Sequence, residues 1–363
     1  MSAAGPLPKR SLPLGGDGAQ RKGAPPVSLE RRSAVTVRTA GRLHLGFLDP
    51  SASLGRAFGS LGLVIDGPAT EVELSVAPGS DVIIAAPSAP AETERAKRHL
   101  QRLREHTGLM QALNLRVLQA LPAHAGFGSG TQLALAVGTS FARLHRLEVD
   151  TATMAQWLGR GLRSGIGIAA FDHGGLLLDG GPSADGTPAP LLSRIDLPAA
   201  WRVVLVQEVQ RGGLSGREEK EAIARLPDLP RAAAADLCHQ VLMRVLSGAA
   251  CGDFEAFAAG INRVQQVLGA HFAPAQGGSA FASAAVERLV RWFGAAQLNE
   301  AAIGQSSWGP TGFAIVPSQA SARALVDAAE AAGAIDPALS VTIVAARNEG
   351  ATVIDSREHR RRA

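Results

Sequence analysis

The sequence predicts an α+β fold, because several strand-like segments precede the first long helix. A doubly wound fold would instead alternate strands and helices from the start. The strand-like segments have alternating or apolar patterns, and the first helix is a charged amphipathic segment. The predicted strands cover residues 35–39, 61–65, 70–76, 81–85 and 113–120, and the helix covers 91–107.

The remainder of the chain predicts a second domain. Residues 180–190 form a Gly/Pro/Asp/Ser loop that can separate two domains. A strand–helix–strand order at the end is like half of a ferredoxin-like unit. We therefore expect a disordered basic tail over 1–32, an N-terminal domain over 33–190, a C-terminal domain over 191–350 and a basic tail over 351–363. Later helices are predicted over 154–163, 217–226, 231–249, 252–268, 279–295 and 318–332, and strands over 201–208, 313–316 and 340–345.

Charge and composition exclude several classes of function. Residues 1–32 carry a net charge of +4 and residues 357–363 carry +3, which leaves −3 for residues 33–356 because the whole chain is +4. A nucleic-acid-binding fold would carry its basic charge on a face of the core. No apolar run reaches the roughly 20 residues of a membrane span, and the N-terminus lacks a signal-peptide core. The two cysteines predict buried thiols in a cytoplasmic protein.

The stretch over residues 121–147 is the strongest candidate for a binding site. Gly126, Gly128 and Gly130 alternate before a helical pattern. Unpaired N–H groups and the helix dipole make such a helix N-terminus attractive to anions, and glycines let the backbone approach a phosphate closely. Ser129 and Thr131 add hydroxyls for a phosphate oxygen or a metal ion. The alternative is a glycine-rich turn that holds no ligand.

Two further segments place polar side chains between glycines. Arg42 and His44 lie two residues apart, so on an extended segment they share a face, where they can grip a phosphate and transfer a proton. Their alternative is the solvent face of a strand. Asp172 and His173 precede the apolar run over 176–178 and suit proton transfer or metal binding. Their alternative is a turn in which Asp172 caps backbone N–H groups. Arg211, in a third loop, is a candidate anion ligand.

Two common nucleotide-binding motifs are absent. The loop reads G-F-G-S-G, without the G-x-G-x-x-G spacing of a dinucleotide fold and without the lysine of a P-loop.

Three segments together resemble a known superfamily. AGRLHLGF over 40–47, PAHAGFGSGTQLALA over 122–136 and GQSSWGPTGFA over 304–314 resemble the three motifs of the GHMP kinases. Asp172 lies where those kinases keep a catalytic aspartate. Within the superfamily, the RLHLGF, GSGTQLALA and QSSWGPTGF variants are similar to the β-ribofuranosylaminobenzene 5′-phosphate synthase family. The resemblance covers residues 34–350.

The resemblance implies a fold and a reaction. The N-terminal domain would be related to ribosomal protein S5 domain 2, the C-terminal domain would be ferredoxin-like, and the site would lie between them. The implied enzyme joins phosphoribosyl pyrophosphate to 4-aminobenzoate or a related para-substituted benzoate, and it releases pyrophosphate and CO₂. The product belongs to tetrahydromethanopterin synthesis. The family also implies a homodimer.

The resemblance suggests roles for the candidate residues. The loop from Gly126 to Gln132 and a Mg²⁺ ion, bound by Thr131 and Asp172, would hold the pyrophosphate. Asp172 would alternatively stabilise the ribosyl cation. Arg42 and Arg211 would bind the 5′-phosphate or the carboxylate. His44 or His173 would orient the acceptor, and Ser306 and Ser307 would bind substrate.

Departures from the kinase pattern leave two alternatives. Kinases of this superfamily usually read G-L-G-S-S-A at the loop, whereas this chain has Gly130 in place of the second serine. The final motif has Ser306, Ser307 and Trp308 in place of a glycine run. Both changes argue against phosphoryl transfer from ATP. A small-molecule kinase with Asp172 as base and a catalytically silent protein that binds a phosphorylated ligand are the alternatives.

Overall fold

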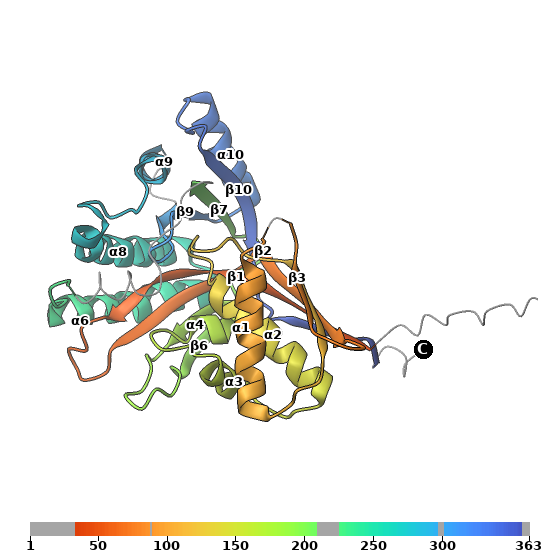
Figure 1. Ribbon diagram of the computed structural model, residues 1–363. Coiled ribbons are helices and arrows are strands. Elements are labelled where there is room, and N and C mark those ends of the chain that lie inside the picture. Colours follow the sequence, from red (N-terminus) through yellow and green to blue (C-terminus); the bar gives the residue numbers. More distant parts are fainter. Residues whose placement is uncertain (1–32, 88, 209–224, 297–300, 358–363) are drawn as a thin grey trace, which may run out of the picture. The chain divides into compact units, whose positions relative to one another are not determined.

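The computed structural model describes residues 33–87, 89–208, 225–296 and 301–357 (Figure 1). They belong to one compact unit that begins at Ser33. The predicted tail over 1–32, most of the predicted helix over 217–226 and the candidate Arg211 lie outside the described residues. The predicted division of the chain near residue 190 stays a prediction.

The α+β order is confirmed, because β1, β2 and β3 precede the first helix, α1. β1 (Ala34–Asp49) and β2 (Phe58–Val76) form a long antiparallel pair. The sequence predicts two strands over 61–65 and 70–76, whereas the structure has one. The register passes from Ala40 opposite Ala69 to Arg42 opposite Val64, so the intervening residues of β2, which include Pro68, form a bulge. A second irregularity lies between His44 and Gly46.

The described strands join into one sheet of eleven strands. The main path runs β11-β1-β2-β10-β7-β9-β8, while β4 and β5 also pair with β2, β3 pairs with β4, and β6 pairs with β5. The short pairing of Ala345 with Asp66 and Ala346 with Ile65 joins β10 to β2. The other strands are β3 (Val82–Ala85), β4 (Leu113–Gln119), β5 (Leu176–Asp179), β6 (Leu191–Ile195), β7 (Arg202–Glu208), β8 (Ala302–Gln305), β9 (Thr311–Val316), β10 (Leu339–Ala346) and β11 (Thr352–Asp355).

Helices cover this sheet over three main apolar cores. The first core lies under α1 (Glu92–Thr107), α2 (Ser129–His145) and α3 (Thr151–Trp157), which pack on β4, the first half of β1 and the second half of β2. The second lies under α6 (Arg231–Gln240) and α8 (Phe254–Phe272), which pack on the second half of β1, the first half of β2 and β7. α9 (Ala284–Ala296) and α10 (Gln319–Ala331) pack on β7 and β9. The remaining helices are α4 (Ile166–Asp172), a π-helical turn (Val241–Leu246), α7 (Ser247–Cys251) and a 3₁₀ turn (Ala273–Gln276).

Several local predictions differ from the structure. Residues 166–172 form the helix α4, so the alternative of a turn in which Asp172 caps backbone N–H groups does not apply to this segment. The predicted C-terminal tail begins too early, since β11 pairs with β1 from Val35 to Arg38. The short strands β6 and β8 were not expected. The helix predicted over 154–163 corresponds to α3, which begins earlier, at Thr151, and ends earlier, at Trp157.

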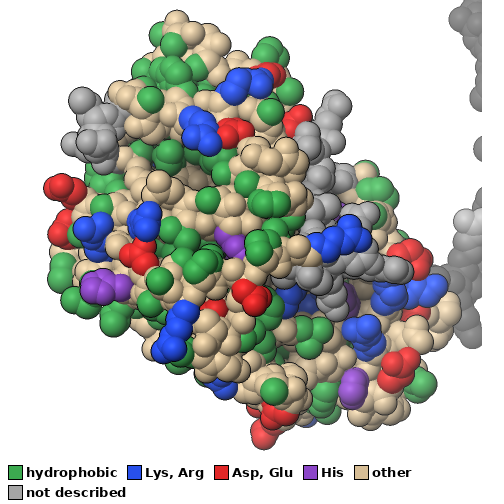
Figure 2. All heavy atoms as spheres, turned by 90° about the vertical axis from the view of Figure 1, so that its left-hand side faces the viewer, with side chains coloured by type: hydrophobic (Ala, Val, Ile, Leu, Met, Phe, Trp, Pro, Cys, Tyr) green, Lys and Arg blue, Asp and Glu red, His purple; other side chains and the backbone are tan. Residues whose placement is uncertain are grey.

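The surface is mixed in character. On the face that carries α6 and α8, hydrophobic, basic and acidic side chains are interspersed (Figure 2). Cys238 and Cys251 are free and exposed, which corrects the prediction of buried thiols. Among the helices of the described ranges, none combines the length and hydrophobicity that a bilayer span requires.

Candidate active site

The glycine-rich loop between β4 and α2 has a backbone that favours glycine at two positions. Gly126 and Gly128 have φ angles of 90° and 80°. A Cβ on Gly126 would lie 2.6 Å from the carbonyl oxygen of Ser306, and a Cβ on Gly128 would lie 3.1 Å from the guanidinium carbon of Arg42. The loop is therefore in close contact with residues from both ends of the described chain.

The N-terminus of α2 is surrounded by arginines. No side chain caps its first turn, and that turn holds no acidic residue. Nη1 of Arg42 donates a hydrogen bond to the carbonyl oxygen of Gly126 at 2.7 Å. Nη2 of Arg95 and Nη1 of Arg160 would lie 3.0 and 3.2 Å from a Cβ on Gly130. Guanidinium groups and free helix N–H groups together favour a multiply charged anion.

The arginine cluster extends behind the loop. Nη2 of Arg160 lies 3.4 Å from Nε2 of the buried His99. Burial and the nearby arginines lower the pKa of Arg160 to about 10 and that of His99 to about 3. Glu92 pairs with Arg95 at 2.7 Å. Burial first, and the positive charge of the arginines second, thus keep His99 neutral.

The next two residues of α2 face inward. Gln132 is fully buried, donates to the carbonyl oxygen of Gly167 at 2.8 Å and accepts from the Thr39 hydroxyl at 2.5 Å. Its backbone N–H donates to the carbonyl oxygen of Gly128. The Gln132 side chain thus joins β1 and α4 to α2, and its role in substrate binding stays a prediction. The Thr131 side chain lies against Gly167, where an added Cβ would approach it to 2.9 Å.

The third motif is wedged between the glycine loop and β1. The Ser306 hydroxyl donates to the carbonyl oxygen of Gly126 at 2.7 Å and accepts from the backbone N–H of His44 at 2.9 Å. The backbone N–H of Ser307 donates to the carbonyl oxygen of His44 at 3.1 Å. Ser307 has a φ of 53°, a strained value for a serine. The structure thus brings Arg42, His44, the glycine loop, Ser306 and Ser307 together.

His44 lines a pocket next to this junction. The side chain is 4% exposed, and its Nε2 has no hydrogen-bond partner. Burial, followed by the charges of Arg42 and Arg163, lowers its pKa to about 3. The ring contacts Phe47 edge to face at 4.6 Å between centroids. The pocket wall also includes Phe272 and Trp308, whose rings lie 5.0 Å apart.

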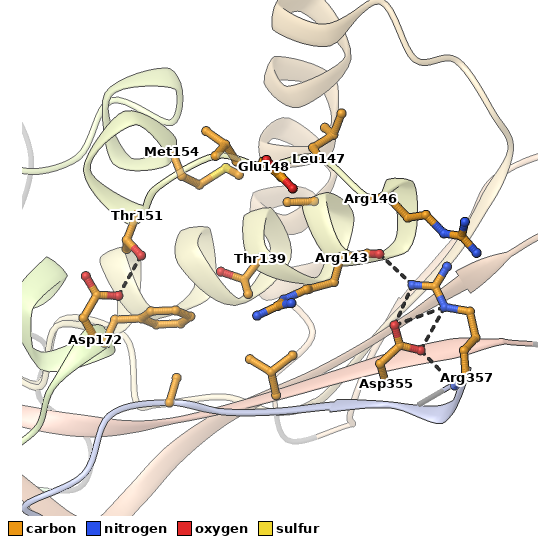
Figure 3. Close-up of a pocket in the computed structure, with 15 residues that line it drawn as sticks. Thr139, Arg143, Arg146, Leu147, Glu148, Thr151, Met154, Asp172, Asp355 and Arg357 are labelled. Atoms are coloured by element: carbon orange, nitrogen blue, oxygen red, sulfur yellow. Dashed lines mark hydrogen bonds and ion pairs between the residues drawn. The ribbon is translucent and has the colours of Figure 1, made fainter. Parts of the chain in front are cut away.

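Asp172 and His173 line a pocket whose wall includes no residue of the glycine loop. Asp172 is the last residue of α4, and it accepts a hydrogen bond from the Thr151 hydroxyl at 2.6 Å. It also lines a second pocket, with Thr139 and Arg143 from the second half of α2 (Figure 3). Asp172 is five residues after Gly167, the residue that Thr131 contacts, and five residues of helix correspond to a rise of about 7.5 Å. Burial raises the pKa of Asp172.

The chain matches known proteins at the level of sequence. The model of the GHMP kinases N terminal domain matches residues 94–175. The β-ribofuranosylphenol 5′-phosphate synthase of Archaeoglobus fulgidus is 32% identical over 301 residues, which cover 79% of this chain and 89% of the relative. This chain belongs to the β-ribofuranosylphenol 5′-phosphate synthase family. The family member of Methanothermobacter thermautotrophicus is 31% identical over 248 residues, or 64% of this chain and 75% of the relative.

Solved structures of lower identity share the fold of this synthase family member. Homoserine kinase from Cytophaga hutchinsonii superposes with a TM-score of 0.60 at 16% identity, over 88% of this chain and 97% of the kinase. Mevalonate diphosphate decarboxylase from Enterococcus faecalis superposes with a TM-score of 0.61 at 15% identity, over 89% and 99% of the two chains. The prediction of a GHMP-kinase-like fold is confirmed.

The donor set of this synthase family member suits an anion better than a bare metal ion. The Thr131 side chain lies against Gly167, and Asp172 accepts a hydrogen bond from Thr151, so the predicted magnesium site at Thr131 and Asp172 stays a prediction. Within the described ranges, no cluster of three or more His, Cys, Asp or Glu side chains is suited to a metal. The residues that approach the glycine loop are mainly arginines, and they do not form a magnesium site of their own.

Arg95 and Arg160 are the site residues that the sequence did not reveal. Arg95 belongs to a helix whose many charges are typical of a solvated face, and Arg160 lies in the turn after α3. Their nearness to Gly130 depends on the packing of α1 and α3 on α2, which no local pattern encodes. A charged helix one strand upstream of a predicted phosphate loop was the one available signal.

Proposed function

We propose that this chain is a pentosyltransferase that joins phosphoribosyl pyrophosphate to 4-hydroxybenzoate or 4-aminobenzoate, with release of pyrophosphate and CO₂. The observation that carries the proposal is the arginine-ringed glycine loop, Arg42, Arg95 and Arg160 around the free N-terminus of α2. The name of the curated relatives describes a ribofuranose 5-phosphate joined to a phenol. That product, like its aniline counterpart, would serve tetrahydromethanopterin synthesis.

The loop would stabilise the leaving pyrophosphate. As the bond from ribose C1 to oxygen breaks, both electrons stay on that oxygen and negative charge grows there. Preorganised N–H groups and guanidinium groups aimed at that charge lower the barrier, each by roughly 2–4 kcal/mol by analogy with oxyanion holes. Arg42 and Arg160 supply such groups without rearrangement, because the backbone and His99 already contact them. The candidate Arg211 would add to the binding of the 5′-phosphate or the carboxylate.

The acceptor would attack through the ring carbon that bears its carboxylate. A bond forms between this carbon and ribose C1, and the ring becomes cationic. The bond to the carboxylate then breaks, its electron pair restores aromaticity, and CO₂ leaves. Since CO₂ takes the place of a proton, the reaction needs no base to deprotonate the ring. Ser306 and Ser307 lie between the loop and the aromatic-lined pocket, where the two substrates would meet.

A kinase remains the second candidate because the fold is shared with kinases. A kinase of this type needs a base near the transferred phosphoryl group. At the glycine loop, the Thr131 side chain lies against Gly167, which has no side chain that could act as a base. Asp172, the candidate base, instead accepts a hydrogen bond from Thr151. This arrangement favours the transferase.

Other features of the proposal rest on the family and on composition. We infer that magnesium, where needed, enters with the diphosphate rather than on a protein site. We also infer that the protein is a cytoplasmic homodimer. Size-exclusion chromatography with light scattering tests the oligomeric state.

One assay tests the proposal. The purified protein is incubated with magnesium, phosphoribosyl pyrophosphate and carboxyl-labelled 4-hydroxybenzoate or 4-aminobenzoate, without ATP. Equal amounts of labelled CO₂ and pyrophosphate are expected. Failure to release either, together with ATP-dependent phosphorylation of a small alcohol, would overturn the transferase in favour of the kinase.

A further inference from the structure

The pocket beside His44 has the composition of a site for a flat aromatic ligand. Three aromatic rings contribute to its wall, from Phe47, Phe272 and Trp308, and Leu268 adds an aliphatic surface. The Phe272 and Trp308 rings are tilted at 60° to each other. Aromatic walls of this kind bind a planar ring through its faces and edges.

The three glutamine side chains of this pocket have hydrogen-bond partners within the protein, whereas one buried nitrogen of His44 has none. Gln305 donates to Gln276 at 2.9 Å and accepts from the Ala282 backbone at 2.6 Å. Gln276 in turn donates to the Ala280 carbonyl oxygen, and Gln265 donates to the Leu45 carbonyl oxygen. Gln265 also accepts from the Gln305 backbone. These three side chains therefore shape the pocket without a ligand.

The nitrogen without a partner is Nε2 of His44, which is buried. A neutral histidine ring carries its proton on one of the two nitrogens, and we place it on Nδ1. With its proton on Nδ1, the neutral ring offers Nε2 as an acceptor. A buried acceptor without a donor is costly, so it indicates a ligand that brings an N–H or O–H group.

We propose that this pocket, whose volume is about 40 Å³, receives the para end of the aromatic acceptor, whose hydroxyl or amino group donates a hydrogen bond to Nε2 of His44. The inference rests on the proposed function and names the acceptor site within it. Arg42 contacts the glycine loop, and His44 follows two residues later on β1. The para group would therefore lie away from the loop, and the carboxylate-bearing carbon would face the ribose.

This orientation gives His44 a role in the reaction as well as in binding. When ribose C1 bonds to the ring, positive charge spreads to the para oxygen or nitrogen. A hydrogen bond from that group to Nε2 strengthens as the charge grows, and it weakens again when CO₂ leaves. The proton stays on the para group overall, so the atoms balance. The neutral state of His44 is essential, because a protonated ring would repel the cation.

A binding experiment separates this inference from catalysis. The chain has four tryptophans and no tyrosine, so tryptophan fluorescence reports on the pocket through Trp308. Titration with 4-hydroxybenzoate, with and without inorganic pyrophosphate, is expected to quench the wild-type emission. The quench should disappear in Trp308→Phe and persist in the matched control Trp292→Phe, which lies in the α9 core.

The hydrogen bond is tested with an isosteric ligand. Wild-type protein should bind 4-hydroxybenzoate about tenfold more tightly than 4-methylbenzoate, which lacks the donor. His44→Phe should reduce this preference to about onefold, His44→Gln should restore part of it, and the control His145→Phe should keep it. Isothermal calorimetry gives the same ratios without tryptophan.

The outcomes are distinct. A tenfold preference that survives in His44→Phe, or a quench that survives in Trp308→Phe, would overturn the inference. Absence of any binding to wild-type protein, while labelled CO₂ is released, would also overturn it but leave the proposed function intact. Binding with the expected preference but without CO₂ release would support the pocket and count against the proposed reaction. If His44→Phe does not fold, the results for Trp308→Phe and His44→Gln still decide whether the acceptor binds in this pocket.

Discussion

Ser306 and Gly126 are joined by a 2.7 Å hydrogen bond although 180 residues separate them in sequence. The same hydroxyl accepts from the backbone of His44. One side chain thus connects the glycine loop, β1 and the third motif. A loop that must hold a diphosphate next to an acceptor needs such a connection, because small displacements of reacting groups reduce rates greatly.

Ser306→Ala should therefore damage both activity and stability. It removes two hydrogen bonds and leaves the buried N–H of His44 without its acceptor, which should cost about 1–3 kcal/mol of unfolding free energy. We expect kcat/KM for CO₂ release to fall about 10- to 100-fold. The control Ser318→Ala removes the N-cap of α10 at a cost of about 1 kcal/mol, and its activity should be unchanged. Equal activities of the two variants would contradict the connection.

The arginine cluster predicts strong binding of pyrophosphate itself. Arg160→Met should weaken the Kd for inorganic pyrophosphate about 10- to 100-fold, because a partly buried charged hydrogen-bond donor is lost. The thermal stabilisation by pyrophosphate should shrink accordingly. Arg98→Met is the control, since Arg98 is exposed and acts on Arg160 only through its charge. Arg98→Met should weaken the Kd for pyrophosphate by less than about threefold, and this difference should vanish at high salt. Similar losses in both variants would argue against a direct contact.

Asp172 and Asp179 lie seven residues apart and should respond differently to substitution by asparagine. Asp172 makes one hydrogen bond, from Thr151, that an amide oxygen can keep. Asp172→Asn should therefore retain activity within about threefold and stability within about 1 kcal/mol. A loss of about 1000-fold or more in kcat would restore the catalytic role that its sequence position suggests.

Asp179 serves as the contrast because it is a structural carboxylate. It is fully buried and accepts N–H groups from Ser60, Gly165, Ile166 and Gly181. Asp179→Asn would point an NH₂ group at these donors and should cost about 2–4 kcal/mol. Urea unfolding measures the cost. Equal stability of the two variants would contradict this reading of the segment.

These two aspartates illustrate what the sequence could and could not predict. The strand before the glycine loop, the loop itself and the helix after it follow from apolar spacing and glycine chemistry. The pairing of the RLHLGF and QSSWGPTGF segments came only from the family resemblance, since no local property joins His44 to Ser306. Asp172 was favoured for proton transfer or metal binding because it lies between glycines in sequence, whereas in the structure it is the last residue of α4. The contacts of Asp179 depend on β2 and α4 meeting in space.

The buried histidines predict a specific loss of stability in acid. The pKa of His44 and that of His99 fall from 6.5 to about 3 on folding, with burial as the main cause. The unfolded state therefore binds more protons than the folded state between about pH 3 and 6.5, and stability falls as the pH drops through that window. From pH 7.5 to 5.0, each histidine should remove about 2 kcal/mol of unfolding free energy.

The measurement is urea unfolding at both pH values for wild type and variants. His44→Phe and His99→Phe should each reduce the loss between pH 7.5 and 5.0 by about 2 kcal/mol relative to wild type, and the double variant should reduce it by the sum. Trp292→Phe should show the wild-type loss. Carboxyl groups that titrate near pH 5 affect all of these proteins alike, so the difference between variants isolates the histidines. A wild-type loss in both histidine variants would mean that neither ring is held neutral by the fold, and would remove the neutral acceptor that the aromatic pocket requires.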